Sequence, residues 1–218
     1  MDCRKRLLFF DCDSTLTSIE GLDVIAYEKG MEEDISKITK LGMEGGISFR
    51  ESFAMRMSKL KPNLLDIEKL SVRYIESINT DVKETVSKLL NSGCELYIVS
   101  GGLQSALIEV GKYLGIPSSN IYGIDIYFSP DGNYLDFDKG SLFLEPKGKL
   151  RVIKQILKSY DGSSIQSTMF VGDGITDLET RDIVDNVVIY TNHIDRDLSI
   201  SLSNVRSTKD ITSLLSTL

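Results

Sequence analysis

Four short apolar runs, separated by amphipathic stretches, constrain the fold of this 218-residue chain most strongly. They cover residues 7–10, 96–99, 168–171 and 187–190, and each has the length of a buried strand. The clearest helical pattern lies between the second and third runs, where residues 103–114 place apolar side chains at helical spacing. Strands that alternate with helices predict an α/β fold with a parallel sheet.

One long segment interrupts this alternation. Residues 20–79 contain no convincing strand, and stretches such as 49–60 carry apolar side chains at helical spacing. We therefore expect a helical insertion over residues 18–79, placed within a core formed by residues 1–17 and 80–218. Because the insertion begins just after the first strand, it is expected to lie over the strand ends like a lid.

A second excursion covers residues 121–137. Its side chains alternate between apolar and polar, and the strong turn sequence Pro130-Asp131-Gly132-Asn133 lies in its middle. This pattern predicts a small β-hairpin near the edge of the sheet.

Polar residues follow three of the predicted strands. The first strand ends in Asp11-Cys12-Asp13, where the two carboxylates project to the same side of an extended chain. Two like charges held so close need a cation or a shared proton. The other two strands end in Ser100-Gly101-Gly102 and in the run 172–177. Each ending alone is also typical of a turn, but parallel strands bring all three to one edge, where α/β sheets form their sites.

Composition and charge exclude several classes of protein. The net charge of −7 offers no broad basic surface for a nucleic acid or an anionic membrane. Three cysteines without a CxxC spacing indicate reduced thiols and a cytoplasmic protein. The apolar run 7–10 is too short for a signal peptide or a membrane span. The single histidine, His193, argues against hydrolases with several histidine ligands or a Ser-His-Asp triad. An EF-hand calcium loop is excluded because Leu16 and Leu22 stand where it needs Gly and Glu.

The three strand endings together resemble the haloacid dehalogenase superfamily of aspartate-nucleophile phosphotransferases. Residues 11–15 fit its DxDxT signature, Ser100 its hydroxyl motif, and residues 172–177 its GDGxxD motif. Within the superfamily the chain is most similar to the phosphoserine phosphatase family, in its motifs at 20–23 and 43–46 and at Arg56. The resemblance implies a Rossmann-like parallel sheet core with an inserted helical cap.

The resemblance also implies roles for the acidic residues. Asp11 is expected to attack phosphorus and form an aspartyl-phosphate, while Asp13 gives a proton to the leaving alcohol. Asp11, Asp173 and the backbone carbonyl of Asp13 would supply hard oxygens to Mg²⁺. Asp177 is counted in this metal set, with the alternative that it orients a bound water or a neighbouring ligand.

The phosphate is expected to lie against Ser100 and the backbone amides of Gly101 and Gly102. A lysine should help to neutralise its charge, and Lys147 and Lys149 are both candidates. Apolar residues follow Lys149 at positions +3, +4 and +7, so we favour Lys149 and expect the other lysine on a solvated face. The Thr176 hydroxyl can form a hydrogen bond near the phosphate, although many relatives have Asn at this position.

The insertion should determine which substrate binds. In the family that the chain resembles, the positions of Glu20 and Arg56 bind the amino group and the carboxylate of phosphoserine, and a planar guanidinium suits a carboxylate. Arg56 can also be read as an exposed charge of the insertion. Met43 and Phe49 are expected to form a wall of the pocket, though packing within the insertion explains both equally well.

The leading hypothesis is therefore a Mg²⁺-dependent phosphatase that converts L-phosphoserine to L-serine and phosphate, in serine biosynthesis. One alternative keeps the chemistry and changes the substrate to another small phosphomonoester, or the acceptor to an alcohol. Another is a non-catalytic module that uses Asp11 as a phospho-acceptor, against which Asp13 argues. The expected partner is a small phosphomonoester, with no nucleic acid and no membrane; no pattern indicates an oligomeric state.

Overall fold

The computed structural model describes residues 4–190 and 204–217 of the chain. Its main sheet has six strands in the order β3-β2-β1-β6-β7-β8, and every neighbouring pair is parallel. The predicted parallel α/β fold is therefore confirmed, with two strands that the sequence had not indicated as members of this sheet, β3 and β8. The six strands are β1 (Lys5–Phe10), β2 (Glu95–Leu103), β3 (Ile121–Ile124), β6 (Ile165–Gly172), β7 (Asn186–Tyr190) and β8 (Val205–Thr208).

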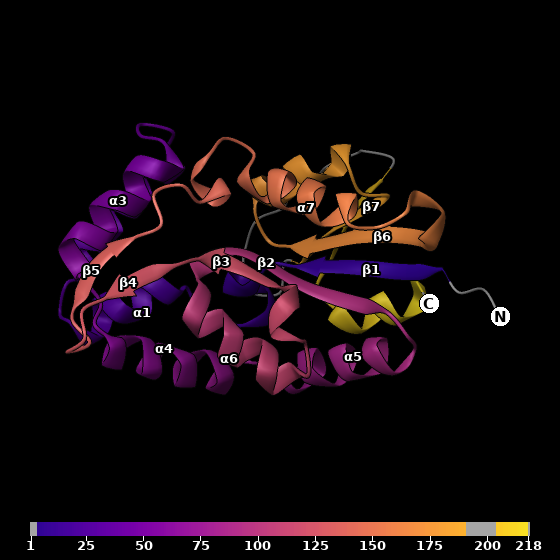
Figure 1. The fold of residues 1–218 in the computed structure, drawn as a ribbon, viewed down its shortest axis with the longest axis horizontal. Helices are drawn as coiled ribbons and strands as arrows, with labels where there is room; N and C mark the ends of the chain where they lie inside the picture. Colours follow the sequence, from indigo (N-terminus) through magenta and orange to yellow (C-terminus); the bar gives the residue numbers. More distant parts are fainter. Residues whose placement is uncertain (1–3, 191–203, 218) are drawn as a thin grey trace.

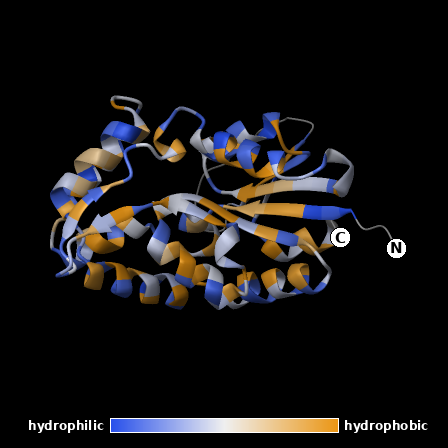
Figure 2. Cartoon of the chain, viewed as in Figure 1, coloured by the Kyte–Doolittle hydropathy of each residue, from blue (hydrophilic) through white to orange (hydrophobic). Residues whose placement is uncertain are grey.

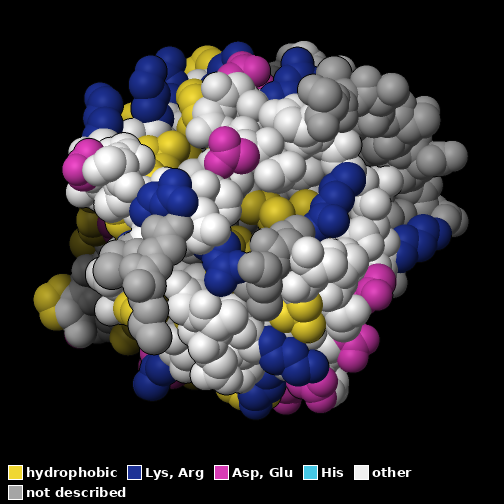
Figure 3. Space-filling view, turned by 90° about the vertical axis from the view of Figure 1, so that its right-hand side faces the viewer, with side chains coloured by type: hydrophobic (Ala, Val, Ile, Leu, Met, Phe, Trp, Pro, Cys, Tyr) yellow, Lys and Arg dark blue, Asp and Glu magenta, His cyan; other side chains and the backbone are white. Residues whose placement is uncertain are grey.

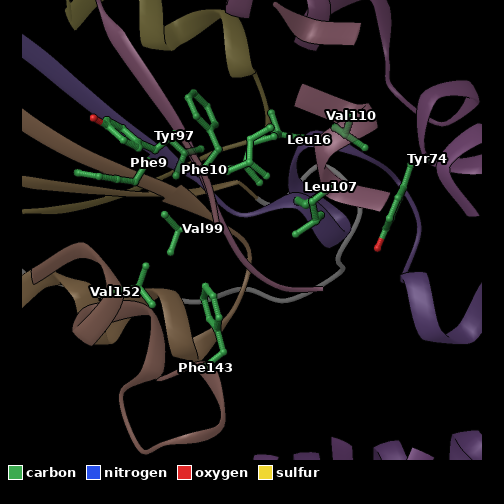
Figure 4. Close-up of a cluster of buried hydrophobic side chains, with 14 of the residues drawn as sticks. Phe9, Phe10, Leu16, Tyr74, Tyr97, Val99, Leu107, Val110, Phe143 and Val152 are labelled. Atoms are coloured by element: carbon green, nitrogen blue, oxygen red, sulfur yellow. The ribbon is translucent and has the colours of Figure 1, made fainter. Parts of the chain in front are cut away.

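Helices cover both faces of the sheet (Figure 1). On one face lie α5 (Thr80–Asn91) and α6 (Gln104–Leu114), and on the other lies α7 (Gly148–Lys158). The strands between these layers are largely hydrophobic, whereas the helices mix hydrophobic and hydrophilic residues (Figure 2). Phe9 of the central strand β1 is fully buried, and its ring stacks on that of Tyr97 in β2 with 5.1 Å between the ring centroids (Figure 4). The apolar runs of the sequence thus form the buried strands of the sheet.

Residues 21–76 form four helices, which we call the helical segment. They are α1 (Gly21–Glu28), α2 (Glu32–Met43), α3 (Phe49–Leu60) and α4 (Leu64–Glu76). Capping boxes begin two of them: Ser48 and Glu51 at α3, and Asn63 and Asp66 at α4. The helical segment lies beyond the carboxyl ends of β1 and β2 (Figure 1).

The helical segment joins the rest of the chain through two stretches of backbone that lie side by side. Both the backbone N–H and the hydroxyl of Ser18 donate to the carbonyl of Ser77, each at 3.3 Å. Residue 18 follows the turn after β1, and residue 77 follows α4. The chain therefore enters and leaves the helical segment at one place.

The predicted hairpin over residues 121–137 is wrong in its first part. Ile121–Ile124 is β3, which pairs in parallel with β2, and only β4 (Ile126–Phe128) and β5 (Tyr134–Phe137) form an antiparallel hairpin. A parallel edge strand and a hairpin arm both alternate with a period of two residues, so the pattern alone does not separate them. The hairpin reaches α4, where the Leu64 N–H donates to the Gly132 carbonyl at 2.9 Å.

Short helical turns complete the described chain, and within these residues no helix is both long and apolar enough to cross a membrane. The short turns are η1 (Cys12–Leu16), η2 (Ser118–Asn120), η3 (Leu142–Leu144), η4 (Gly162–Ser164), α8 (Ile175–Leu178), η5 (Glu179–Asp182) and η6 (Ile211–Thr217). His193 lies outside the described residues.

Candidate active site

The turn after β1 places Asp11 and Asp13 on the same side of the chain. Both residues have extended backbone, while Cys12 between them is fully buried. The chain then reverses at Ser14, whose φ of 52° lies in the left-handed region that most residues avoid. Burial, followed by the charge of Asp11, raises the pKa of the Asp13 carboxyl to about 6. The two carboxylates therefore act on each other, as their spacing predicts.

Lys149 enters the site from the first turn of α7. Its Nζ lies 2.5 Å from Asp11 Oδ2 and 2.5 Å from Asp177 Oδ1, and all three side chains are largely buried. Burial by itself lowers the pKa of Lys149, but the charges of Asp11 and Asp177 outweigh it and raise that pKa. Lys147 instead lies 3.5 Å from Asp182 and is 54% exposed. Of the two candidate lysines, Lys149 is the one that lies at the site.

Three carboxylates gather around this lysine. One oxygen from each of Asp11, Asp173 and Asp177 lies within 4.8 Å of the others. Burial, and then the charges of Asp11 and Asp177, raise the pKa of Asp173 to about 7. Three carboxylates around a single ammonium leave excess negative charge, which is the environment that binds a divalent cation. The donor set consists of oxygens and so suits a hard ion such as Mg²⁺.

The two other predicted metal ligands differ from Asp11 and Asp173. Asp177 is fully buried, and its second oxygen, Oδ2, accepts from the Gly174 N–H at 2.9 Å. Both of its oxygens are engaged by protein donors, but so are both oxygens of Asp11, which accept from the Cys12 N–H at 2.7 Å and from Lys149. Asp177 differs from Asp11 in its complete burial, which favours an orienting role. The Asp13 side chain is not part of the cluster of three carboxylates. Only the Asp13 backbone carbonyl remains as its predicted contribution to a metal site.

The phosphate-binding edge is built by the end of β2, which runs on to Leu103 and includes the predicted Ser-Gly-Gly motif. Ser100 is buried, and its Oγ accepts from the Gly102 N–H at 3.2 Å. A Cβ placed on Gly102 would lie 3.4 Å from Asp13 Oδ2, so this edge faces the paired carboxylates. A Cβ on Gly101 would lie 3.0 Å from the Phe49 ring. Glycine therefore lets the helical segment approach the strand end.

Glu20 and Arg56 bring opposite charges to the same side of the site. Glu20 Oε1 accepts from the Ser14 hydroxyl at 2.6 Å, and burial, then the charge of Asp13, raises the pKa of Glu20 to about 8. Burial lowers the pKa of Arg56, while the charges of Asp23, Glu20 and Asp13 act to raise it. Arg56 therefore lies within electrostatic reach of the site and is not simply an exposed charge of the insertion.

The remaining predicted binding residues are less enclosed. Met43 at the end of α2 is 65% exposed and Phe49 is 43% exposed. Thr176 is also exposed, in α8. The structure thus brings together Phe49 and the Ser-Gly-Gly edge. Among the described residues, no hydrogen bond joins the Thr176 side chain to an acidic residue of the site.

One residue of the site gave no signal in the sequence. The hydroxyl of Tyr74, in α4, donates to Asp13 Oδ1 at 2.6 Å, and the Gly21 N–H donates to the same oxygen at 2.9 Å. Tyr74 is fully buried, and burial and the Asp13 charge raise its pKa. The position of Tyr74 in an amphipathic helix predicts only that it is a core residue. The one general clue to its contact with Asp13 is that a buried tyrosine hydroxyl usually has a hydrogen-bond partner.

Two hollows in the described structure lie away from Asp11. One of about 240 Å³ lies toward the amino ends of the strands, where Leu8, Cys94 and Met169 meet Arg6 and Arg206. Figure 3 looks onto this side, with apolar and basic side chains next to each other near its centre. The other, of about 540 Å³, is lined by residues of α1 and α4 and by neighbouring residues that include Glu20. Only the second shares a residue with the candidate site.

Comparisons with known proteins agree with this geometry. The haloacid dehalogenase-like hydrolase family matches residues 5–180. A phosphoserine phosphatase of Methanocaldococcus jannaschii is 34% identical over 179 residues, which are 82% of each chain. The phosphoserine phosphatase of Bos taurus is 30% identical over 81% of this chain and 77% of its own. A crystal structure of a phosphoserine phosphohydrolase-like protein from Francisella tularensis has a TM-score of 0.81 at 29% identity, and the match covers 98% of this chain and 99% of that one. The chain therefore belongs to the haloacid dehalogenase-like hydrolases and, among them, to the phosphoserine phosphatase family.

Proposed function

We propose that the protein is a Mg²⁺-dependent phosphatase that hydrolyses O-phospho-L-serine to L-serine and phosphate. The observation that carries this proposal is the cluster of Asp11, Asp173 and Asp177 around Lys149 at the carboxyl ends of β1 and β6. The cluster holds three carboxylates and one ammonium group within a small volume, and these would serve as nucleophile, metal ligands and counter-charge. Such an arrangement suits attack on a phosphate dianion, which must be neutralised before an anion can approach it.

Asp11, Asp173 and the Asp13 carbonyl are the groups that would hold Mg²⁺, and Asp177 would orient them. The bound ion would supply positive charge against the phosphate oxygens. Lys149 already holds one Asp11 oxygen at 2.5 Å, so that carboxylate has a fixed direction before substrate binds. The Ser100 hydroxyl and the Gly101 amide would donate to the phosphate, and so would the Gly102 N–H, which here donates to Ser100 Oγ at 3.2 Å.

The proposed reaction has two steps. An Asp11 oxygen forms a bond to phosphorus while the bond from phosphorus to the serine oxygen breaks, and Asp13 gives its proton to that oxygen. Asp13 then takes a proton from water as the water oxygen attacks the aspartyl-phosphate, and this attack releases phosphate and restores Asp11. The raised pKa of Asp13, about 6, supports its role as a proton donor near neutral pH.

The helical segment supports the choice of substrate. Glu20 and Arg56 present an acid and a guanidinium on one side of the site, the complement of an ammonium and a carboxylate on one carbon. The pKa of Glu20, about 8, means that the empty site keeps this acid largely neutral. A substrate ammonium would favour its ionised form. Phe49, which faces Gly101, would pack on the substrate between these groups and the phosphate.

We further propose that residues 18–79 act as a cap on a catalytic core of residues 1–17 and 80–218. The paired connections at Ser18 and Ser77 support this division, because both crossings lie at one place. A cytoplasmic location is proposed as well. It is supported by the free thiols of Cys12 and Cys94, which are buried and belong to no disulfide among the described residues.

A phosphate-release assay tests the proposed function. The purified protein is incubated with a panel of phosphomonoesters, including O-phospho-L-serine, O-phosphothreonine and glycerol phosphate, with Mg²⁺ or with a chelator. We expect turnover of O-phospho-L-serine that disappears with chelator and returns with added Mg²⁺. Better turnover of another ester would replace the substrate and keep the chemistry. A stable phosphoprotein without phosphate release would support the non-catalytic alternative.

A further inference from the structure

We propose that Tyr74, a residue of the helical segment, is a positioning residue that fixes which oxygen of Asp13 carries the transferred proton. The inference rests on the proposed function, in which Asp13 is the proton donor. The Tyr74 hydroxyl donates to Asp13 Oδ1 at 2.6 Å, and the tyrosine is fully buried. The hydroxyl therefore makes this contact away from solvent, where such a bond is strong.

Two donors converge on the same oxygen of Asp13. Besides the Tyr74 hydroxyl, the backbone N–H of Gly21 points at Oδ1 from 2.9 Å. An oxygen that accepts two hydrogen bonds does not also carry the carboxyl proton, because a protonated carboxyl oxygen is itself a donor. The proton of neutral Asp13 must then lie on Oδ2. That oxygen lies on the side of Gly102, where a Cβ would be 3.4 Å from it.

This arrangement directs the proton toward the phosphate-binding edge. Ser100 and Gly102 form that edge, and the oxygen of the leaving alcohol must lie close to it when phosphate is bound. Without the Tyr74 hydroxyl, the Asp13 carboxyl would keep only one fixed donor and could rotate or place its proton on either oxygen. A proton donor in the wrong geometry loses much of its catalytic effect.

Gly21 and Tyr74 fit each other closely. A Cβ on Gly21 would lie 2.1 Å from Tyr74 Oη and 2.9 Å from its Cζ. Neither distance is possible for real atoms, so the tyrosine reaches Asp13 only because residue 21 is glycine. Gly21 begins α1 and Tyr74 lies in the last turn of α4, and these two helices pack against each other. Two separate parts of the helical segment thus combine at one oxygen.

The helix that carries Tyr74 packs against a helix of the core. Helix α4 packs against α6, and Figure 4 shows Tyr74 alongside Leu107 and Val110 of that helix. Tyr74 lies only three residues before Ser77, whose carbonyl accepts from Ser18. Tyr74 therefore lies close to the point where the helical segment joins the rest of the chain.

The first test replaces only the hydroxyl. Tyr74→Phe should lower kcat/KM for O-phospho-L-serine by ~10-fold, since general acid catalysis contributes ~10²–10⁴-fold in all and one of two positioning contacts is lost. With p-nitrophenyl phosphate the loss should stay within ~2-fold, because a nitrophenolate leaves without a proton. The ratio kcat/KM is used because it reports the steps up to departure of the alcohol and not the later hydrolysis.

The matched control is Tyr97→Phe. The Tyr97 hydroxyl binds Glu95 and Tyr160, remote from the site, so neither substrate should be affected. A purely structural role of Tyr74 predicts equal losses on both phosphate esters. Equal losses, or no loss with O-phospho-L-serine, would overturn the inference.

The second test uses O-phospho-L-serine alone. Gly21→Ala should lower kcat/KM in the wild-type background, because its Cβ displaces the Tyr74 hydroxyl. In a Tyr74→Phe background the same change should cost clearly less than in the wild-type background, because the hydroxyl that this Cβ displaces is already gone and only the milder contact with Cζ, at 2.9 Å, remains. Losses that multiply would overturn the inference while wild-type turnover stands. If the wild-type protein releases phosphate from no monoester, the proposed function itself fails.

Discussion

The two halves of the candidate site differ in how far they are organised before any ligand binds. In the half formed by the strand ends, Lys149 Nζ lies 2.5 Å from a carboxylate oxygen of Asp11 and 2.5 Å from one of Asp177. Each of these three side chains is at most 10% exposed. In the half formed by the helical segment, Met43 is 65% exposed and Phe49 is 43% exposed. The first half is set for the chemistry common to phosphate esters. The second has contacts left to make, and these can distinguish one ester from another.

The largest effect is expected at the nucleophile of the organised half. Asp11→Asn should lower kcat by at least ~10⁴-fold, because an amide oxygen does not form the aspartyl-phosphate. Phosphate release from O-phospho-L-serine measures this loss, with circular dichroism to show that the variant is folded. Turnover near the wild-type rate would remove Asp11 from its proposed role.

Lys147 and Lys149 lie two residues apart at the start of α7 and give a matched test of the organised half. Lys149→Met should lower kcat/KM by ~10²–10³-fold, as for other charge-stabilising groups. It should also destabilise the metal-free protein by about 3–5 kcal/mol, because buried carboxylates lose their counter-charge. Lys147→Met should change kcat/KM by less than ~2-fold, since its partner Asp182 lies at the surface. Denaturant unfolding and phosphate release measure the two effects, and a reversed order would assign the site to Lys147.

Arg56 tests whether the second half controls binding more than chemistry. Arg56→Ala should raise KM for O-phospho-L-serine by ~10–100-fold and change kcat little, because a bidentate contact to the substrate carboxylate is lost. Arg50→Ala in the same helix is the control, as Arg50 pairs with Glu145 at the surface. Equal effects on KM for an ester without a carboxylate would exclude the proposed contact.

The last prediction concerns stability and its dependence on pH, and it involves no change in the catalysed reaction. The pKa of Glu20 is about 8 in the folded protein, whereas an unfolded Glu ionises near ~4.3. Between these values the unfolded state has lost a proton that the folded state keeps, so stability falls as pH rises through this window. Glu20→Gln removes the effect. Its Tm in metal-free buffer should exceed that of the wild type by an amount that grows from acid pH to about pH 8.

Glu51→Gln gives the opposite sign and serves as the control. Hydrogen bonds from the backbone and side chain of Ser48 lower the pKa of Glu51, so the wild-type carboxylate stabilises α3 above its unfolded pKa and loses this effect in acid. The Glu51→Gln variant should be less stable than the wild type near neutral pH and similar to the wild type at low pH. Parallel Tm curves for Glu20→Gln and the wild type would show that Glu20 is not held neutral in the folded protein.

The sequence predicts the organised half better than the other, for a physical reason. Strand ends in a parallel sheet meet at one edge whatever the surrounding loops do, so Asp11, Ser100 and Asp173 could be brought together from their order alone. The contact of Tyr74 with Asp13 depends on how α4 sits against the turn after β1, which no local pattern encodes. Strand β8 was missed because Val205–Thr208 is short and largely polar, at the edge of the sheet.

The close approach of Ser18 and Ser77 bears on how such a protein can acquire new substrates over evolutionary time. Because the two ends of the helical segment meet within one hydrogen bond, the segment takes up no more of the core than a short turn would. A segment of different length or shape can be exchanged at these two neighbouring peptides without displacing Asp11 or Lys149. Recombination at a single point in space would then change what is recognised, while descendants inherit Asp11 and Lys149 in place and need only a new donor in the role proposed for Tyr74.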